Sequence, residues 1–303
     1  MPKTKEPLKS LLLLLATEQG ANLKIIREKL VQFGPEALAQ LRHHYATASS
    51  TAEPDTTTAA DRLGDVIEEI NGRQLEHDWR RWLQRPDLEE GGLLLSRFAY
   101  PEIETEGYQG LLDAMAEELR AVVRHERWPD GVIRVMNHHL FTEKGFHGNT
   151  VHYYDPDNSF LNRVLDRRVG IPITLSAVYL LLARRLDLPI VGIGMPSHFL
   201  VKCDVPGRDL YLDPFNAGQS LTKAECASFL INSGYGFKEQ YLQPVTDQEI
   251  LVRMMRNLIY IYGERQEPRK VRWLSRFVDI AQPDRSVASP ASDGSAYPDD
   301  PAA

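Results

Sequence analysis

The sequence predicts an α+β protein, in which a central buried helix packs on a small antiparallel sheet between a large N-terminal helical region and a C-terminal helical hairpin. Residues 174–186 are apolar on almost every side, which indicates a helix enclosed by other elements. Residues 189–213 form short β-prone runs around a Pro-Gly turn, which predicts antiparallel strands. Residues 247–281 have helical spacing interrupted near Gly263, which predicts the hairpin.

The first half of the chain predicts further helices. Residues 1–46 repeat leucine and isoleucine at helical spacing, and Gly34-Pro35 separates two of these helices. Residues 47–60 are small and polar, which predicts a flexible linker. The predicted regions are N-terminal helices (1–46), a linker (47–60), a helical lead-in plus core (61–246), a helical hairpin (247–283) and a disordered tail rich in Ser, Pro and Asp (284–303).

Composition restricts the classes of function. The chain has 303 residues, enough for one large domain or two modest ones, and a net charge of −7 disfavours non-specific nucleic-acid binding. Two cysteines, Cys203 and Cys226, cannot form a disulfide framework and favour a reducing compartment. The leucine run 11–15 is too short to cross a membrane, and no cleavage site for a signal peptide follows it. We therefore expect a cytoplasmic protein that binds neither nucleic acid nor membrane.

His198 and Asp213 are the residues most suggestive of chemistry. Both lie in or beside predicted strands that should pair, so their side chains could meet on one face. An Asp that orients a His fixes its tautomer and supports an imidazolium during acid–base catalysis. The alternative, which the spacing alone favours, is a core histidine and an aspartate that begins a turn before Pro214.

Three long segments carry a resemblance to a known family. YDPDNSFLNRVLDRRVGIPITLSAVYLLLARRL, MPSHFLVK and YLDPFNAGQSLT resemble, in this order, the transglutaminase-like SirB family of bacterial proteins. The similarity extends from about Leu93 to Ala281. It implies a papain/transglutaminase-like core with a short tetratricopeptide-like tail, in which a nucleophile at a helix N-terminus, a His and an Asp follow one another. His198 and Asp213 match the last two positions.

The nucleophile position differs from the pattern of the wider superfamily. There, the helix typically begins as Gly-x-Cys and ends at Leu-Gly-Ile/Leu-Pro. Gly170-Ile171-Pro172 and Leu186-Asp187-Leu188-Pro189 match these two signatures and place Pro172 in the Cys position. Because proline has no side-chain heteroatom, the resemblance implies a candidate dyad with a degenerate nucleophile position.

Four other residues could supply a nucleophile. Thr174 and Ser176 flank the same helix start, although Thr174 also suits a helix cap and Ser176 a buried small position. Cys203 should lie on the opposite face of its strand from His198, because side chains alternate. Cys226 is most simply a small buried hydrophobe in a short helix.

The expected cleft also includes polar residues near the start of the central helix. These are Asn158, Asn162, Arg167, Arg168 and Thr174. The two arginines could bind an anionic ligand at the helix N-terminus or, in the more ordinary case, form ion pairs at a helix end.

No cofactor or metal site is predicted. Neither a P-loop nor a G-x-G-x-x-G motif is present, and the adjacent histidine pairs, His43-His44 and His138-His139, point to different helix faces. Two functions remain open. The first is a non-catalytic transglutaminase-like module that binds a protein or peptide partner. The second is an acyl-transfer or amide-hydrolysing enzyme that uses His198 and Asp213 with a replaced nucleophile or an activated water.

Overall fold

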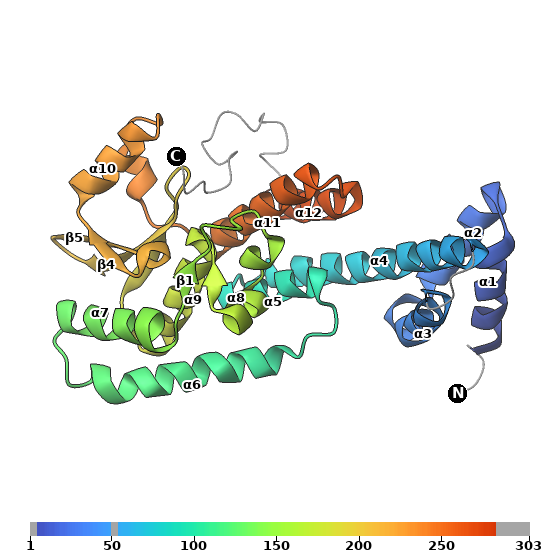
Figure 1. Ribbon diagram of the computed structural model, residues 1–303, viewed down its shortest axis with the longest axis horizontal. Coiled ribbons are helices and arrows are strands. Elements are labelled where there is room, and N and C mark those ends of the chain that lie inside the picture. Colours follow the sequence, from blue (N-terminus) through green and yellow to red (C-terminus); the bar gives the residue numbers. More distant parts are fainter. Residues whose placement is uncertain (1–4, 50–53, 283–303) are drawn as a thin grey trace. The chain divides into compact units, whose positions relative to one another are not determined.

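The structure, a computed structural model, describes residues 5–49 and 54–282 (Figure 1). Contacts within the chain divide it into two units, Met1–Asp78 and Trp79–Ala303, so the division falls inside a helix. Each unit is described by itself below. The predicted disordered tail, 284–303, lies outside the described residues.

The first unit is helical. Its elements are α1 (Lys5–Thr17), α2 (Gly20–Gln32), the 3₁₀ helix η1 (Gly34–Ala37), α3 (Leu38–Ser49) and the N-terminal part of α4 (Pro54–Trp82). Aliphatic side chains from all four α-helices form its core, including Leu15, Leu30, Leu41 and Val66. Arg62 of α4 donates hydrogen bonds to three carbonyl oxygens at the end of α1, which satisfies acceptors that the helix leaves unpaired.

Most of the predicted linker is helix, which corrects the sequence prediction. Residues 47–49 complete α3 and residues 54–60 begin α4, while 50–53 lie outside the described residues. Ala is the best helix former, and a Pro in the first turn removes no intrahelical hydrogen bond. A small, polar composition without an apolar stripe therefore did not exclude a helix here.

The second unit contains the remaining helices. The α-helices are α5 (Leu88–Ala99), α6 (Thr105–Val123), α7 (Asp130–Asn137), α8 (Leu161–Arg167), α9 (Pro172–Arg185), α10 (Lys223–Asn232), α11 (Asp247–Glu264) and α12 (Pro268–Ala281). The short helices are the π-helix η2 (His138–Glu143) and the 3₁₀ helices η3 (Pro156–Ser159), η4 (Pro214–Asn216) and η5 (Glu239–Leu242).

The main sheet is an antiparallel meander in the order β3-β4-β5-β6. Its strands are β3 (Ile190–Ile193), β4 (Leu200–Val205), β5 (Arg208–Asp213) and β6 (Gln219–Leu221). A separate parallel pair joins β1 (His147–Gly148) to β2 (Val169–Gly170). Val205 pairs with Arg208, so only Pro206 and Gly207 form the β4–β5 turn, and the positive φ of Gly207 (74°) suits a residue without Cβ. The α+β class predicted from the sequence is confirmed.

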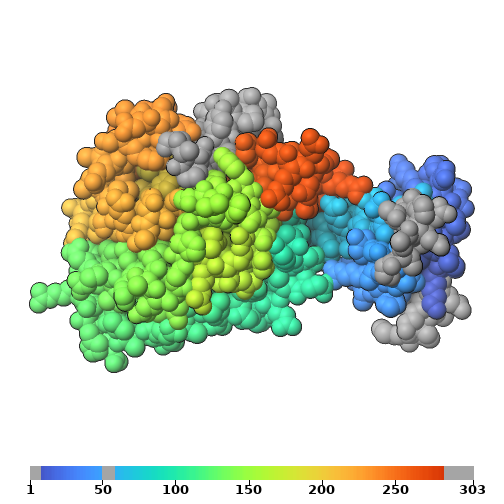
Figure 2. All heavy atoms as spheres, in the orientation of Figure 1, coloured from blue at the N-terminus to red at the C-terminus, as the bar shows by residue number. Residues whose placement is uncertain are grey.

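Helix α9 is the most enclosed element of the second unit, and every residue from Pro172 to Ala183 is buried. It contacts β3 and β4, while α10 lies against the sheet with Cys226 and Leu230 packed near Leu200 and Tyr211. Figure 2 shows the residues of α10 (orange) beside those of the strands. The helix begins at Pro172, as the sequence predicts.

The basic end of α9 is held by acidic side chains. Arg184 makes a bidentate ion pair with Asp247, and Arg185 pairs with Glu89 and Asp113. Cations at a helix C-terminus also interact favourably with the helix dipole.

Helices α11 and α12 form the predicted C-terminal hairpin, which packs on α5 and α9. Thr246 and Glu249 form a capping box at the start of α11. The tetratricopeptide-like character of this hairpin stays a prediction.

Candidate functional site

The hydrogen bond predicted between His198 and Asp213 is present. Asp213 ends β5, and His198 lies two residues before β4 begins. The pairing of Val201 with Leu212 brings these two segments together at one end of the sheet. His198 Nε2 lies 2.8 Å from Asp213 Oδ2, and the two side chains are only 12% and 7% exposed.

Asp213 is fixed by more than the histidine. Its Oδ1 accepts hydrogen bonds from the backbone N–H groups of Phe215 and Asn216, and its Oδ2 accepts a third from Asn216 Nδ2. Burial opposes ionisation of Asp213, but the hydrogen bonds from His198 and Asn216 outweigh it and hold its pKa below the usual value. Asp213 is therefore an anion at neutral pH.

The anion determines which nitrogen of His198 is available. A carboxylate only accepts hydrogen bonds, so a neutral imidazole carries its proton on Nε2 and leaves the Nδ1 lone pair exposed to a ligand or reactant. Nδ1 has no hydrogen-bond partner in the described part of the chain. The arrangement can therefore accept a hydrogen bond or, with a suitable reactant, remove a proton.

A pocket of about 310 Å³ opens beside the pair. Its walls include the aromatic residues Tyr153, Phe215 and Phe229. The His198 ring centroid lies 5.5 Å from that of Phe229 and 6.3 Å from that of Phe215. Two carboxyl groups, Asp213 and Glu225, line the pocket, and none of its described lining residues is Lys or Arg. The pocket is therefore both aromatic and acidic.

The start of α9 also lines this pocket, through Pro172. The two hydroxyl candidates nearby do not line the pocket. Thr174 Oγ1 accepts a hydrogen bond from the Ile171 N–H and donates one of 2.7 Å to the Asn158 carbonyl, so it caps the helix. Ser176 is buried, with its Oγ 3.4 Å from the Phe199 carbonyl oxygen.

Both cysteines are fully buried, but only one lies at the pocket. Cys226 of α10 lines it, a position that the sequence analysis did not predict. Burial raises the pKa of the Cys226 thiol to about 12 and that of Cys203 to about 11. The thiolate is the nucleophilic form, so neither residue is suited to attack at neutral pH.

The asparagines predicted for the cleft have internal roles instead. Asn158 is fully buried, and its side chain donates to the carbonyl oxygens of His152 and Tyr153 and accepts from Asn149. It therefore shapes the loop that brings Tyr153 to the pocket. Asn162 is buried and lies next to Ser96, whose hydroxyl oxygen accepts a hydrogen bond from the Asn162 backbone N–H.

The two arginines also lie outside the pocket lining. Arg167 forms ion pairs with Asp155 (2.8 Å) and Asp157 (3.4 Å), and Arg168 is an exposed residue that ends α8 in the left-handed conformation. Of the eight residues predicted for the site, the structure therefore brings Pro172, His198 and Asp213 together at one pocket, while Thr174 bonds to the backbone at the start of the same helix.

The residues that sequence reasoning missed are mainly aromatic. Tyr153, Phe215 and Phe229 come from a loop, a 3₁₀ helix and α10, and no short motif unites them. Asn216 was detectable, because it stands within the Asp-Pro-Phe-Asn segment and two of its groups reach back to Asp213. A side chain three residues after an Asp often closes a local turn of this kind.

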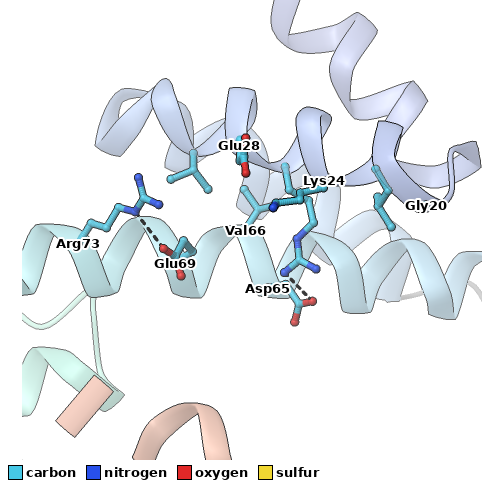
Figure 3. Close-up of a pocket in the computed structure, with 10 residues that line it drawn as sticks. Gly20, Lys24, Glu28, Asp65, Val66, Glu69 and Arg73 are labelled. Carbon is cyan, nitrogen blue, oxygen red and sulfur yellow. Dashed lines mark hydrogen bonds and ion pairs between the residues drawn. The ribbon is translucent and has the colours of Figure 1, made fainter. Parts of the chain in front are cut away.

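A second groove belongs to the first unit. About 330 Å³ in volume, it lies between α2 and α4 (Figure 3). Its charges largely cancel, because Arg27 pairs with Asp65 and Arg73 with Glu69, each at 2.9 Å. Across residues 5–49 and 54–282 we find no group of three or more His, Cys, Asp or Glu side chains placed to hold a metal ion. None of the described helices combines the length and apolarity that a membrane span requires.

Comparison with known proteins is consistent with the resemblance seen in the sequence. Residues 106–256 match the family model of the transglutaminase-like superfamily, so this part of the chain is similar to a transglutaminase-like domain. A UPF0162 protein of Xylella fastidiosa is 38% identical over 179 residues, covering 56% of this chain and 63% of that protein. A UPF0162 protein of Vibrio cholerae is 31% identical over 173 residues, covering 56% and 64%.

A eukaryotic protein is also similar. Human F-box only protein 21 is 28% identical over 235 residues, which cover 66% of this chain and 37% of that protein. The chain thus spans less than two thirds of the length of the curated relatives described here. No solved structure matches it.

Proposed function

We propose that the transglutaminase-like domain is a non-catalytic binding module, which holds an extended segment of a partner protein in the pocket beside His198. One observation carries this proposal: the pocket joins an aligned His198–Asp213 pair to Pro172, at the position where the superfamily pattern has its cysteine. The fold thus retains the acid–base pair and offers a side chain without a heteroatom in place of the nucleophile.

The chemistry of the pocket suits a peptide. Nδ1 of His198 can accept a hydrogen bond from a peptide N–H or a side-chain hydroxyl, and the aromatic walls can bury an apolar group. A volume of about 310 Å³ is at the lower end for a ligand pocket and fits a side chain with its adjoining backbone. The carboxylates favour segments without acidic residues.

An enzymatic function remains the alternative because the His–Asp pair supports it. A positioned His can act as a general base toward water or toward a hydroxyl that a substrate brings. Such an enzyme would release or transfer an acyl group, and its rate would depend on His198.

A selection experiment tests the proposal. Full-length protein is immobilised and used to select binders from a phage-displayed library of random peptides, and the affinities of enriched peptides are measured by calorimetry. We expect Phe229→Arg, which fills the pocket, to weaken binding at least about tenfold, the equivalent of about 1.4 kcal/mol. The matched control is Phe237→Arg, because Phe237 is exposed and does not line the pocket.

Two results would contradict the proposal. Equal affinity of the Phe229→Arg and wild-type proteins would place peptide binding elsewhere. Turnover of the same peptides, measured by mass spectrometry and abolished by His198→Ala, would establish the enzymatic alternative.

A further inference from the structure

The turn that carries His198 has an unfavourable local conformation. Residues Met195 to His198 form a reverse turn, in which the His198 N–H donates to the Met195 carbonyl oxygen over 3.3 Å. Pro196 suits the second position of such a turn, but Ser197 at the third has φ of +56°, a region that favours glycine. The Ser197 hydroxyl is buried and has no hydrogen-bond partner among the residues that the structure describes. Neither the backbone nor the side chain of Ser197 therefore stabilises the turn.

Arg253 contacts both ends of this turn. It lies on α11 of the C-terminal hairpin, more than fifty residues further along the chain. Its Nη1 donates to the Met195 carbonyl oxygen (2.6 Å) and its Nη2 to the His198 carbonyl oxygen (3.0 Å). Its guanidinium carbon lies 5.7 Å from the centre of the Phe199 ring. One planar group thus holds the two carbonyls that flank Ser197.

We propose that Arg253 is the positioning residue of the site. By closing the turn from Met195 to His198, it directs the imidazole toward Asp213 and keeps the Nε2–Oδ2 hydrogen bond in place. Strained backbone persists only where surrounding contacts determine it, and such strain is common at functional sites. The C-terminal hairpin is therefore a part of the site, because Arg253 adds a side-chain contact to both ends of a turn that is otherwise closed by one long backbone hydrogen bond.

The guanidinium shape is essential to this role. Arg presents donors in a fixed fork, which matches two carbonyls at a set separation, whereas Lys is a flexible point charge. If charge alone mattered, Arg253→Lys would behave as the wild type. If the fork matters, both Arg253→Lys and Arg253→Gln release the turn.

The test observes His198 directly. Full-length protein labelled with ¹⁵N-histidine is examined by NMR, in which an imidazole N–H bonded to a carboxylate gives a downfield proton signal. The chain has nine histidines, and the signal that His198→Ala removes is assigned to His198. We expect the Arg253→Gln and Arg253→Lys proteins to lose this signal. Arg256→Gln is the matched control, because Arg256 lies one turn along the same helix and bonds to Gln282; it should keep the signal.

A second variant separates positioning from general stability. Ser197→Gly removes the penalty of positive φ, so we expect the Ser197→Gly, Arg253→Gln double variant to recover the downfield signal. No recovery would show that Arg253 acts on something other than the turn, and would overturn the proposal. Retention of the wild-type signal in both Arg253 single variants would overturn it as well. Should Arg253→Gln fail to fold, Arg253→Lys and its double variant with Ser197→Gly decide the question.

The inference rests on the proposed function only for the importance of the pocket. The NMR signal reports the His198–Asp213 hydrogen bond whether or not a peptide binds. A pocket that binds no peptide would therefore remove the proposed function and leave Arg253 as the residue that positions His198.

Discussion

The two walls of the pocket differ in whether they offer a polar group to a ligand. On the wall formed by the start of α9, Pro172 has no polar side chain, and the hydroxyl of Thr174, which does not line the pocket, bonds to the protein's own backbone. On the wall formed by the sheet, Asp213 accepts four hydrogen bonds, while Nδ1 of His198 has no partner among the described residues. On the sheet wall, Nδ1 of His198 can therefore interact with another molecule. On the helix wall, the residues at the start of α9 contribute only to the stability of the fold. This asymmetry suits recognition better than chemistry, because acyl transfer needs reactive groups on both sides.

Of the substitutions considered, Thr174→Val should destabilise the start of α9, and with it the fold, the most. The substitution keeps the shape but leaves the Asn158 carbonyl and the Ile171 N–H without their hydroxyl partner in a buried place. We expect the free energy of unfolding to fall by about 2 kcal/mol. Urea denaturation followed by tryptophan fluorescence measures this, because Trp79, Trp82, Trp128 and Trp273 all belong to the second unit. A loss below about 0.5 kcal/mol would mean that the hydroxyl does not cap α9.

Asp213→Asn tests the sheet wall. We expect it to lower the free energy of unfolding somewhat less than Thr174→Val does, by about 1.5 kcal/mol near neutral pH. The effect should depend on pH in a definite direction. Because the pKa of Asp213 is lower in the folded than in the unfolded protein, its ionisation stabilises the fold above the unfolded value of about 4. That stabilisation is lost as the pH falls through the folded pKa. The difference between the wild-type and variant unfolding free energies should therefore shrink below about pH 4, and a constant difference down to about pH 2 would contradict the assignment.

Ser176→Ala should have the smallest effect. Its Oγ lies 3.4 Å from the Phe199 carbonyl oxygen, a long hydrogen bond, and alanine leaves little space unfilled. We expect a change of no more than about 0.5 kcal/mol in the same denaturation measurement. A loss equal to that of Thr174→Val would show that the two hydroxyls contribute alike and that the capping role of Thr174 is not special.

The sequence predicted the parts of the site that lie on regular elements. The position of Pro172 followed from the apolar helix and its two flanking signatures, and the meeting of His198 with Asp213 followed from two neighbouring strands. The sequence did not predict the direction in which the polar side chains before α9 point. Asn158 turns inward to bond to backbone carbonyls, and Arg167 turns to nearby aspartates, because local partners compete with any ligand.

Long-range contacts account for the rest. Nothing local to the turn at Ser197 indicates that Arg253 of a distant helix will hold it, and nothing in the spacing of α10 indicates that Phe229 will face His198. Such contacts depend on how the hairpin and α10 pack on the core. The prediction of a flexible linker was wrong for another reason, because small polar residues are compatible with both helix and coil.

The most direct test of the asymmetry is to give the helix wall a nucleophile. In Pro172→Cys the introduced thiol stands at the N-terminus of α9 and in the same pocket as His198, so its pKa should be depressed. Burial raises the thiol pKa values of Cys203 and Cys226, so the wild-type protein supplies an unreactive background. At about pH 6 we predict that iodoacetamide alkylates the variant faster than either native cysteine, and that adding His198→Ala slows the reaction several-fold. Equal labelling rates with and without His198 would contradict the account, because the sheet wall would then not face the start of α9 as an acid–base partner.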